Sequence, residues 1–323
     1  YIRRGRWIGP APEERPMARM ARNIDIDEEG RYHLRGQVAG PKGYYPLQQK
    51  ENAEQLISII QRFTGLYFCD VVSLVILGTH YHLICLFQAF RELSRETLLE
   101  LAQAFYPGSY RPYLKWGPAD WERFNRRLFN VSELMRNIQQ EFAHWFNKGN
   151  NRKGPFWAGR FQSGPSDNLL ETAYYVELNS VRAGLARLPE KWRYSSTWMR
   201  KHGQDDWLMP LVELLDCDDA DQARRLYWAG LYWTGTKSSK ETDRLIPVEV
   251  AERMEKEQFP RGCFLQHNDS LMRGGKIGSR EVIEAELRAL REKGIYKRRR
   301  HPIPCGVGNL YAVRATRKSY FRL

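Results

Sequence analysis

Apolar and polar residues follow two different periods along the first part of the chain. Residues 31–38 are rich in β-forming side chains, which predicts a first strand. Residues 52–63 repeat apolar positions three and four residues apart, as an amphipathic helix does. The Val/Ile/Leu run at 71–77 and the segment 80–87 predict two strands that Gly78-Thr79 separates. The order strand, helix, strand, strand is typical of a small α+β sheet domain.

Longer helical patterns follow these strands. Residues 93–105 and 131–146 predict helices, the second with a continuous apolar stripe. Between them, residues 106–118 form a loop rich in proline, glycine and aromatic side chains. Residues 168–183 predict a further helix, which Gly184 ends as a C-terminal cap.

A change in composition near residues 201–206 predicts a domain boundary. We expect an N-terminal basic arm at 1–22, a sheet domain at 23–200 and a basic, mainly helical C-terminal extension at 201–323. Three segments of the extension have helical periodicity: residues 208–216, 219–232 and 280–293. Residues 291–323 contain ten Lys or Arg and one acidic residue, Glu292.

The charge balance indicates a polyanionic partner. The chain has 51 Lys and Arg against 38 Asp and Glu, a net charge of +13. Cations that neutralise phosphates release condensed counterions, so this excess favours nucleic acid over other partners, although a basic soluble protein remains the alternative. No apolar run reaches the roughly 18 residues of a membrane-spanning helix, so no membrane partner is expected.

The cysteines and the N-terminus point to the cytoplasm. Five cysteines are scattered without a CxxC pair, which argues against a disulfide framework or a zinc ribbon and fits a reducing compartment. No apolar stretch follows the basic N-terminus, so no signal peptide is predicted. We therefore expect a cytoplasmic protein.

The strand at 80–87 carries the first candidate chemistry, His80-Tyr81-His82. Alternate side chains of a strand share a face, so the two imidazoles lie about 7 Å apart along it. That spacing allows both to bind one divalent cation. A His-x-His pair also occurs by chance in chains with seven histidines, so the pair is only suggestive when taken alone.

The predicted helix at 168–183 carries the second group of candidate catalytic residues. Tyr175, Asn179 and Arg182 stand at i, i+4 and i+7 and therefore share one face. A tyrosine, an amide and a cation on one face are unfavourable in a hydrophobic core, but they are side chains that can bind a phosphate. A solvent-facing polar stripe is the alternative interpretation.

These motifs, in their order, resemble those of the REP-associated tyrosine transposases, within the HUH single-tyrosine transposase superfamily. His80-Tyr81-His82 resembles the His-hydrophobe-His motif, and residues 175–185 resemble the family's tyrosine-helix signature. Residues 154–161 and Trp192-Arg193-Tyr194-Ser195-Ser196 resemble two further family segments. The resemblance spans about residues 23–200 and extends more thinly into the tail.

The resemblance implies an HUH endonuclease fold, a ferredoxin- or RRM-like antiparallel sheet with flanking helices. It implies a site-specific single-stranded DNA endonuclease and strand transferase that forms a 5′-phosphotyrosine. Tyr175 is then the nucleophile, and His80, His82 and Asn179 hold Mg²⁺ or Mn²⁺. Tyr174 is the alternative nucleophile, but it lies about 100° around the helix and lacks the partnership with Asn179.

Ser180 replaces the family's proline, and Gly78-Thr79 replaces the residues that often precede the first histidine. Two other functions remain open: a replication-initiator or relaxase-type nickase, and a domesticated hairpin-binding protein that does not cleave. The resemblance implies single-stranded or hairpin DNA as the partner, and a cytoplasmic prokaryotic protein that acts at the nucleoid. The sequence does not decide between a monomer and a homodimer.

Several basic residues are candidate phosphate contacts, although each is equally well interpreted as a solvated surface cation. They are Arg136, Arg152, Lys153, Arg160 and Arg182, together with the tail cluster Lys297, Arg298, Arg299 and Arg300.

Overall fold

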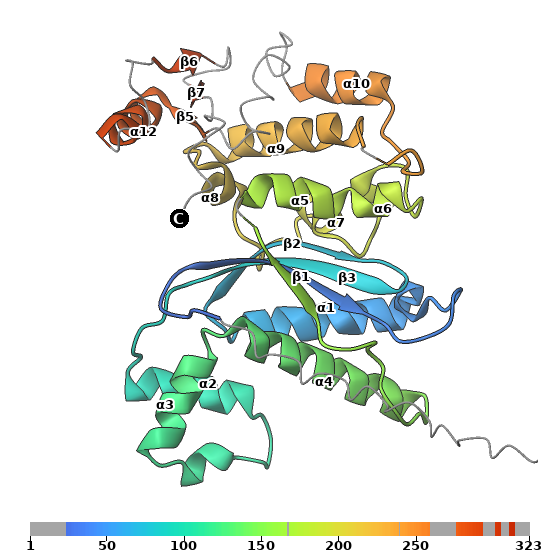
Figure 1. The fold of residues 1–323 in the computed structure, drawn as a ribbon, viewed down its shortest axis with the longest axis vertical. Helices are drawn as coiled ribbons and strands as arrows, with labels where there is room; N and C mark the ends of the chain where they lie inside the picture. The colour runs from blue at the N-terminus through green and yellow to red at the C-terminus, as the bar shows by residue number, and fades with distance from the viewer. Residues whose placement is uncertain are drawn as a thin grey trace, which may run out of the picture.

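The computed structural model describes residues 24–166, 168–238, 240–258, 276–292, 301–304 and 310–313. A four-stranded antiparallel sheet, in the order β2-β3-β1-β4, lies at its centre with helices on both faces (Figure 1). The strands are β1 (Gly30–Gln37), β2 (Cys69–Ile76), β3 (His80–Phe87) and β4 (Gln162–Pro165). The predicted α+β class, with an antiparallel sheet and flanking helices, is confirmed.

Helices cover both faces of the sheet, which explains the apolar runs of its central strands. α1 (Lys50–Thr64) and α4 (Val131–Gly149) lie on one face, and α5 (Leu169–Glu177) lies on the other (Figure 1). Tyr81 and Leu83 of β3 belong to the core under α1 and α4. Ile84 belongs to the smaller core under α5. Strands buried on both sides lose the polar alternation that a half-exposed strand shows.

Further short elements connect these layers. They are α2 (Arg95–Phe105), α3 (Pro118–Arg127), α6 (Asn179–Arg182) and α7 (Ser196–Lys201), with the 3-10 turns η1 (Pro46–Gln48), η2 (Pro112–Lys115) and η3 (Pro189–Lys191). None of the helices in the described residues is long and apolar enough to cross a membrane.

The helix predicted over 168–183 divides in two. α5 ends at Glu177 and α6 begins at Asn179, with Leu178 in a turn between them. The Ser180 hydroxyl donates to the Glu177 carbonyl at 3.3 Å, a local bond that competes with the helical ladder. The predicted cap is confirmed, since Gly184 has a positive φ of 70°.

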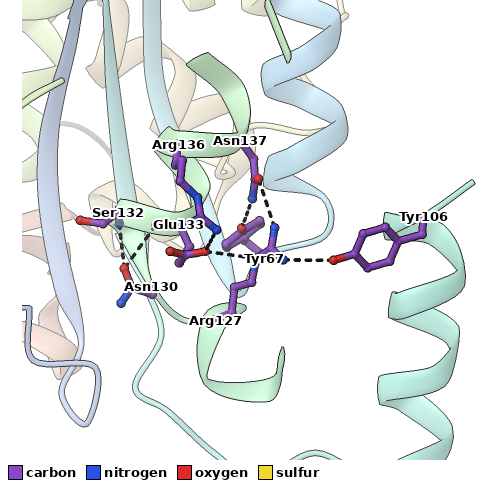
Figure 2. Close-up of polar contacts among 8 residues, drawn as sticks. All are labelled: Tyr67, Tyr106, Arg127, Asn130, Ser132, Glu133, Arg136 and Asn137. Atoms are coloured by element: carbon purple, nitrogen blue, oxygen red, sulfur yellow. Dashed lines mark hydrogen bonds and ion pairs between the residues drawn. The ribbon is translucent and has the colours of Figure 1, made fainter. Parts of the chain in front are cut away.

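The α2–α3 segment between β3 and α4 is anchored by a polar network (Figure 2). Arg127, at the end of α3, donates to Tyr106 at 3.2 Å and to Asn137 of α4 at 3.1 Å. Asn137 donates in turn to the hydroxyl of Tyr67 at 2.6 Å. Arg127 also faces Glu133 at 3.3 Å as an ion pair. These contacts join the ends of α2 and α3 to α4 and to Tyr67, two residues before β2.

The first part of the extension packs against the outer side of α5. α8 (Leu211–Leu215), α9 (Ala220–Gly235) and α10 (Val248–Gln258) share one hydrophobic core with Tyr174 and Leu178 (Figure 1). Gly230 of α9 allows close contact, because a Cβ there would lie 2.3 Å from the Tyr174 hydroxyl oxygen. The helix that carries the candidate nucleophile is therefore enclosed between the sheet and α9.

The end of the extension adds a small sheet that the helical pattern did not predict. β5 (Lys276–Ser279), β6 (Ile303–Pro304) and β7 (Leu310–Val313) form a three-stranded sheet in the order β5-β7-β6, beside α12 (Arg280–Glu292). Strands of two to four residues are too short to show an alternating pattern.

Candidate active site

Three histidines from two strands meet on the sheet face that α5 covers. The register pairs Arg35 with His82 and Gln37 with His80, and directly paired residues point to the same face of a sheet. His33 lies two residues before Arg35, so its side chain shares that face. The imidazoles of His80 and His82 are 5.1 Å apart between ring centroids.

His33, which was not predicted, is the hydrogen-bonding partner of His82. Its Nε2 lies 2.8 Å from Nδ1 of His82, and the two rings stack with centroids 5.0 Å apart. The only sequence signal was its position on the predicted strand, two residues before Arg35 and four before Gln37, which places the three side chains on one face. That signal gains meaning once β1 is known to pair with β3.

Burial keeps these imidazoles neutral. It lowers the pKa of His80 to about 4. It lowers the pKa of His82 to about 2, with further contributions from His80 and His33. The pKa of His33 is also lowered, mainly by burial. A neutral imidazole keeps a ring-nitrogen lone pair, which metal binding requires.

Tyr175 lies beside this cluster. Its ring centroid is 6.1 Å from that of His33 and 6.5 Å from that of His82, and its side chain is 43% exposed. Tyr174, the alternative nucleophile, is fully buried against α9, and burial raises its pKa far above that of free tyrosine. Of these two neighbouring phenols, the one beside the histidines is also the one that a substrate can reach.

Arg182 and Asn179 extend the site along the same helical segment. The Arg182 guanidinium carbon lies 5.2 Å from the centroid of the Tyr175 ring, within cation–π range. A carboxylate of the extension, Asp243, lies 3.8 Å from Arg182 Nε. Asn179 is partly buried, and its Nδ2 has no hydrogen-bond partner among the described residues.

A buried carboxylate holds the tyrosine segment against the sheet. Glu177 is fully buried at the end of α5 and accepts hydrogen bonds from Ser196 at 2.6 Å, from Ser73 of β2 at 3.3 Å, and from Tyr227 of α9. Burial raises the pKa of Glu177. Sequence reasoning missed this residue, because its partners come from three distant segments.

The segment 192–196 completes that attachment. Trp192 donates from its indole to the Ile76 carbonyl at 2.7 Å, and Ser196 hydrogen-bonds both backbone groups of Leu74. Ser195 caps α7 by accepting from the Trp198 amide at 3.2 Å. These hydrogen bonds attach the segment that follows α6 to strand β2. The motif therefore holds the tyrosine segment in place, and within the described part of the chain it makes no hydrogen bond to the histidines or to Tyr175.

The residues of the site suit a divalent cation. Two neutral imidazoles supply nitrogen ligands, and the side-chain oxygen of Asn179 is the ligand type that a hard divalent cation would add to them. Among the described residues, no group of three or more His, Cys, Asp or Glu is arranged to hold a metal. A cation here would therefore need oxygen ligands as well, from an amide, water or a substrate.

Comparison with known proteins yields one distant structural neighbour. No family model and no curated protein matches the chain. Among solved structures, the chain is similar to a REP-associated tyrosine transposase bound to a REP hairpin, at a TM-score of 0.37 and 14% identity. That match covers 58% of this chain and 87% of the other. A likeness at this TM-score assigns neither a family nor an activity.

Among the described candidate phosphate contacts, Arg182 lies over the Tyr175 ring, and the others lie on α4 or in the segment that follows it. Arg136 lies on α4, across the sheet from α5, and is ion-paired with Glu133 (Figure 2). Arg152 donates to the Pro155 carbonyl at 3.3 Å, in the turn after α4. Lys153 and Arg160 are exposed near that turn. Lys297, Arg298, Arg299 and Arg300 lie outside the described residues.

Arg182 and Arg35 lie beside the cluster. Arg35 was not predicted; it donates to Gln37 at 2.5 Å and to Gln162 of β4 at 3.1 Å. Its charge contributes to lowering the pKa of His80 and His82.

Proposed function

We propose that the chain is a metal-dependent DNA-cleaving enzyme with an HUH-type site, in which Tyr175 is the nucleophile. The observation that carries the proposal is the meeting of Tyr175 with His33 of β1 and His82 of β3, at 6.1 and 6.5 Å between ring centroids. The exposure of Tyr175, the guanidinium of Arg182 over its ring and the net charge of +13 support it. The ordered sequence motifs support it independently.

In the proposed reaction, the Tyr175 oxygen attacks a phosphodiester phosphorus and the bond from phosphorus to the 3′-oxygen breaks. The products are a 5′-phosphotyrosine and a strand with a free 3′-hydroxyl, which receives the proton that the phenol loses. A later attack by a 3′-hydroxyl on the phosphotyrosine restores a phosphodiester and releases Tyr175. Both steps exchange one ester for another, so strand transfer needs no ATP.

The protein's residues divide this work. His80, His82 and Asn179 would hold Mg²⁺ or Mn²⁺, which when bound withdraws charge from the scissile phosphate. The Arg182 guanidinium lies over the Tyr175 ring, where it would contact an oxygen of the attacked phosphate. The attacked strand must be unpaired at the cleavage site, so the proposed substrate is single-stranded or hairpin-flanked DNA, with site-specific transposition as its biological use.

A covalent-adduct assay tests the proposal. Labelled hairpin DNA with single-stranded flanks, drawn from repeats next to the protein's own coding region, is incubated with the full chain and Mn²⁺. We expect an adduct that survives denaturing electrophoresis and disappears with chelator or with Tyr175→Phe. Tyr174→Phe is the matched control and should retain the adduct. A binding protein without cleavage would retain the DNA but form no adduct.

A further inference from the structure

The hydrogen bond between His33 and His82 determines which nitrogen of His82 is available. A neutral imidazole carries one proton, so one ring nitrogen donates and the other accepts. Nδ1 of His82 faces Nε2 of His33 at 2.8 Å, and one of these two atoms must carry the proton between them. If His33 donated, the proton of His82 would lie on Nε2, and neither nitrogen of His82 would have a free lone pair.

His80 has the same arrangement with a different partner. Its Nδ1 lies 3.0 Å from the hydroxyl oxygen of Thr79, which can accept a hydrogen bond. Within the described residues, no hydrogen bond reaches Nε2 of His80 or of His82. Each histidine of the pair therefore has Nδ1 engaged by a neighbour, and Nε2 is the nitrogen left for a ligand.

We propose that His33 is a positioning residue: its Nε2 accepts the Nδ1–H of His82 and so directs the Nε2 lone pair of His82 towards the divalent cation. The inference rests on the proposed function, because it assigns His82 as a ligand. Ligating histidines commonly pass their second ring nitrogen to an acceptor, which sets the tautomer and the orientation of the ring. A carboxylate or a carbonyl usually serves as that acceptor; here it is another imidazole.

The pairing of β1 with β3 fixes the position of His33 relative to His82. β1 and β3 pair continuously from Gly30–Phe87 to Gln37–His80, which fixes His33 on the diagonal from His82. The Tyr175 ring meets His33 edge-on at an interplanar angle of 73°. The Nε2 of His33 is engaged with His82 at 2.8 Å, and the described residues hold no group of three or more His, Cys, Asp or Glu arranged around a metal position.

The tautomer is measurable without metal or DNA. Two-bond ¹H–¹⁵N spectra of the full chain with ¹⁵N-histidine should show His82 protonated at Nδ1. In His33→Leu that preference should be lost, and in His33→Gln, whose side-chain oxygen can accept the same proton, it should return. The inference is overturned if His82 of the wild type carries its proton on Nε2.

Metal affinity gives a second readout. Mn²⁺ binding followed by electron paramagnetic resonance should weaken about 10- to 100-fold in His33→Leu, as for other orienting partners of metal ligands. His33→Gln should bind within a few-fold of the wild type. The control is His144→Leu, the same change at an exposed histidine of α4, which should bind as the wild type does. Unchanged affinity in His33→Leu, or three imidazoles bound directly to Mn²⁺, would overturn the orienting role.

The two proposals can fail separately. If no DNA adduct forms but the tautomer and Mn²⁺ results hold, strand cleavage is refuted and the role of His33 stands. If His33→Leu forms the adduct with the Mn²⁺ requirement of the wild type, the role of His33 is refuted and cleavage stands.

Discussion

Two half-buried arginines, Arg127 and Arg182, lie on opposite sides of the sheet and differ in the hydrogen bonds that their guanidinium groups make. Arg127 faces Glu133 at 3.3 Å, and Arg182 faces Asp243 at 3.8 Å; the two arginine side chains are 18% and 15% exposed. Arg127 also donates to two side chains of its network (Figure 2). Among the described residues, the Arg182 side chain makes no hydrogen bond and lies over the Tyr175 ring.

This difference separates a structural cluster from a candidate site. An arginine that donates to several side chains contributes to stability, because removing it leaves those partners unpaired. An arginine with free donors beside an exposed phenol can still bind a phosphate oxygen. Charge and burial alone do not distinguish the structural arginine from the one at the candidate site.

The largest effect on stability is expected at Arg127. Arg127→Leu should lower the free energy of unfolding by about 3 kcal/mol, because Glu133 loses one of its two arginine partners and Asn137 and Tyr106 lose a donor. Urea unfolding measures this, with Arg123→Leu, an exposed arginine of the same helix, as the control. Adduct formation by the folded variant should match the wild type. A stable Arg127→Leu that no longer forms the adduct would reverse the assignment of the two arginines.

Arg182→Gln should give the opposite result. We expect the adduct to form about 30-fold more slowly, because a charge-assisted contact to phosphate contributes about 2 kcal/mol. Stability should change little. The matched control is Arg224→Gln, at an exposed position of α9. If Arg182→Gln unfolds more readily and keeps its rate of adduct formation, Arg182 is a structural residue like Arg127.

The smallest effect is a dependence on alkaline pH at Tyr67. Burial raises the pKa of Tyr67 to about 12, whereas an unfolded tyrosine titrates near 10. Between these values the unfolded chain releases the proton first, so stability falls as pH rises from 10 to 12. The loss should reach about 2 kcal/mol and be absent in Tyr67→Phe. Equal alkaline slopes for both proteins, measured by urea unfolding, would contradict this account of the network.

The sequence predicted the elements with long, regular patterns. The strand at 80–87 has the predicted bounds, and the predicted helices at 52–63 and 131–146 correspond to α1 and α4. β4 escaped prediction because Gln-Ser-Gly-Pro has no apolar alternation and pairs with β1 alone. α3 escaped because its apolar residues are few. Such elements depend on tertiary partners rather than on local pattern.

The candidate site was predictable only in part. His80 and His82 share a local motif, and the face shared by Tyr175 and Arg182 follows from helical spacing. His33 could not be selected because its relation to His82 depends on the register between β1 and β3. Buried carboxylates such as Glu177 give no periodic signal. Strand pairing is thus the information that local patterns lack.

The role of Tyr175 is the central claim, and the covalent adduct tests it most directly. The full chain, cognate hairpin DNA and Mn²⁺ should give a protein–DNA adduct whose proteolytic fragment carries the nucleotide on Tyr175. The adduct should be absent with Tyr175→Phe and present with Tyr174→Phe. An adduct that persists in Tyr175→Phe, or a nucleotide mapped to another residue, would contradict the account.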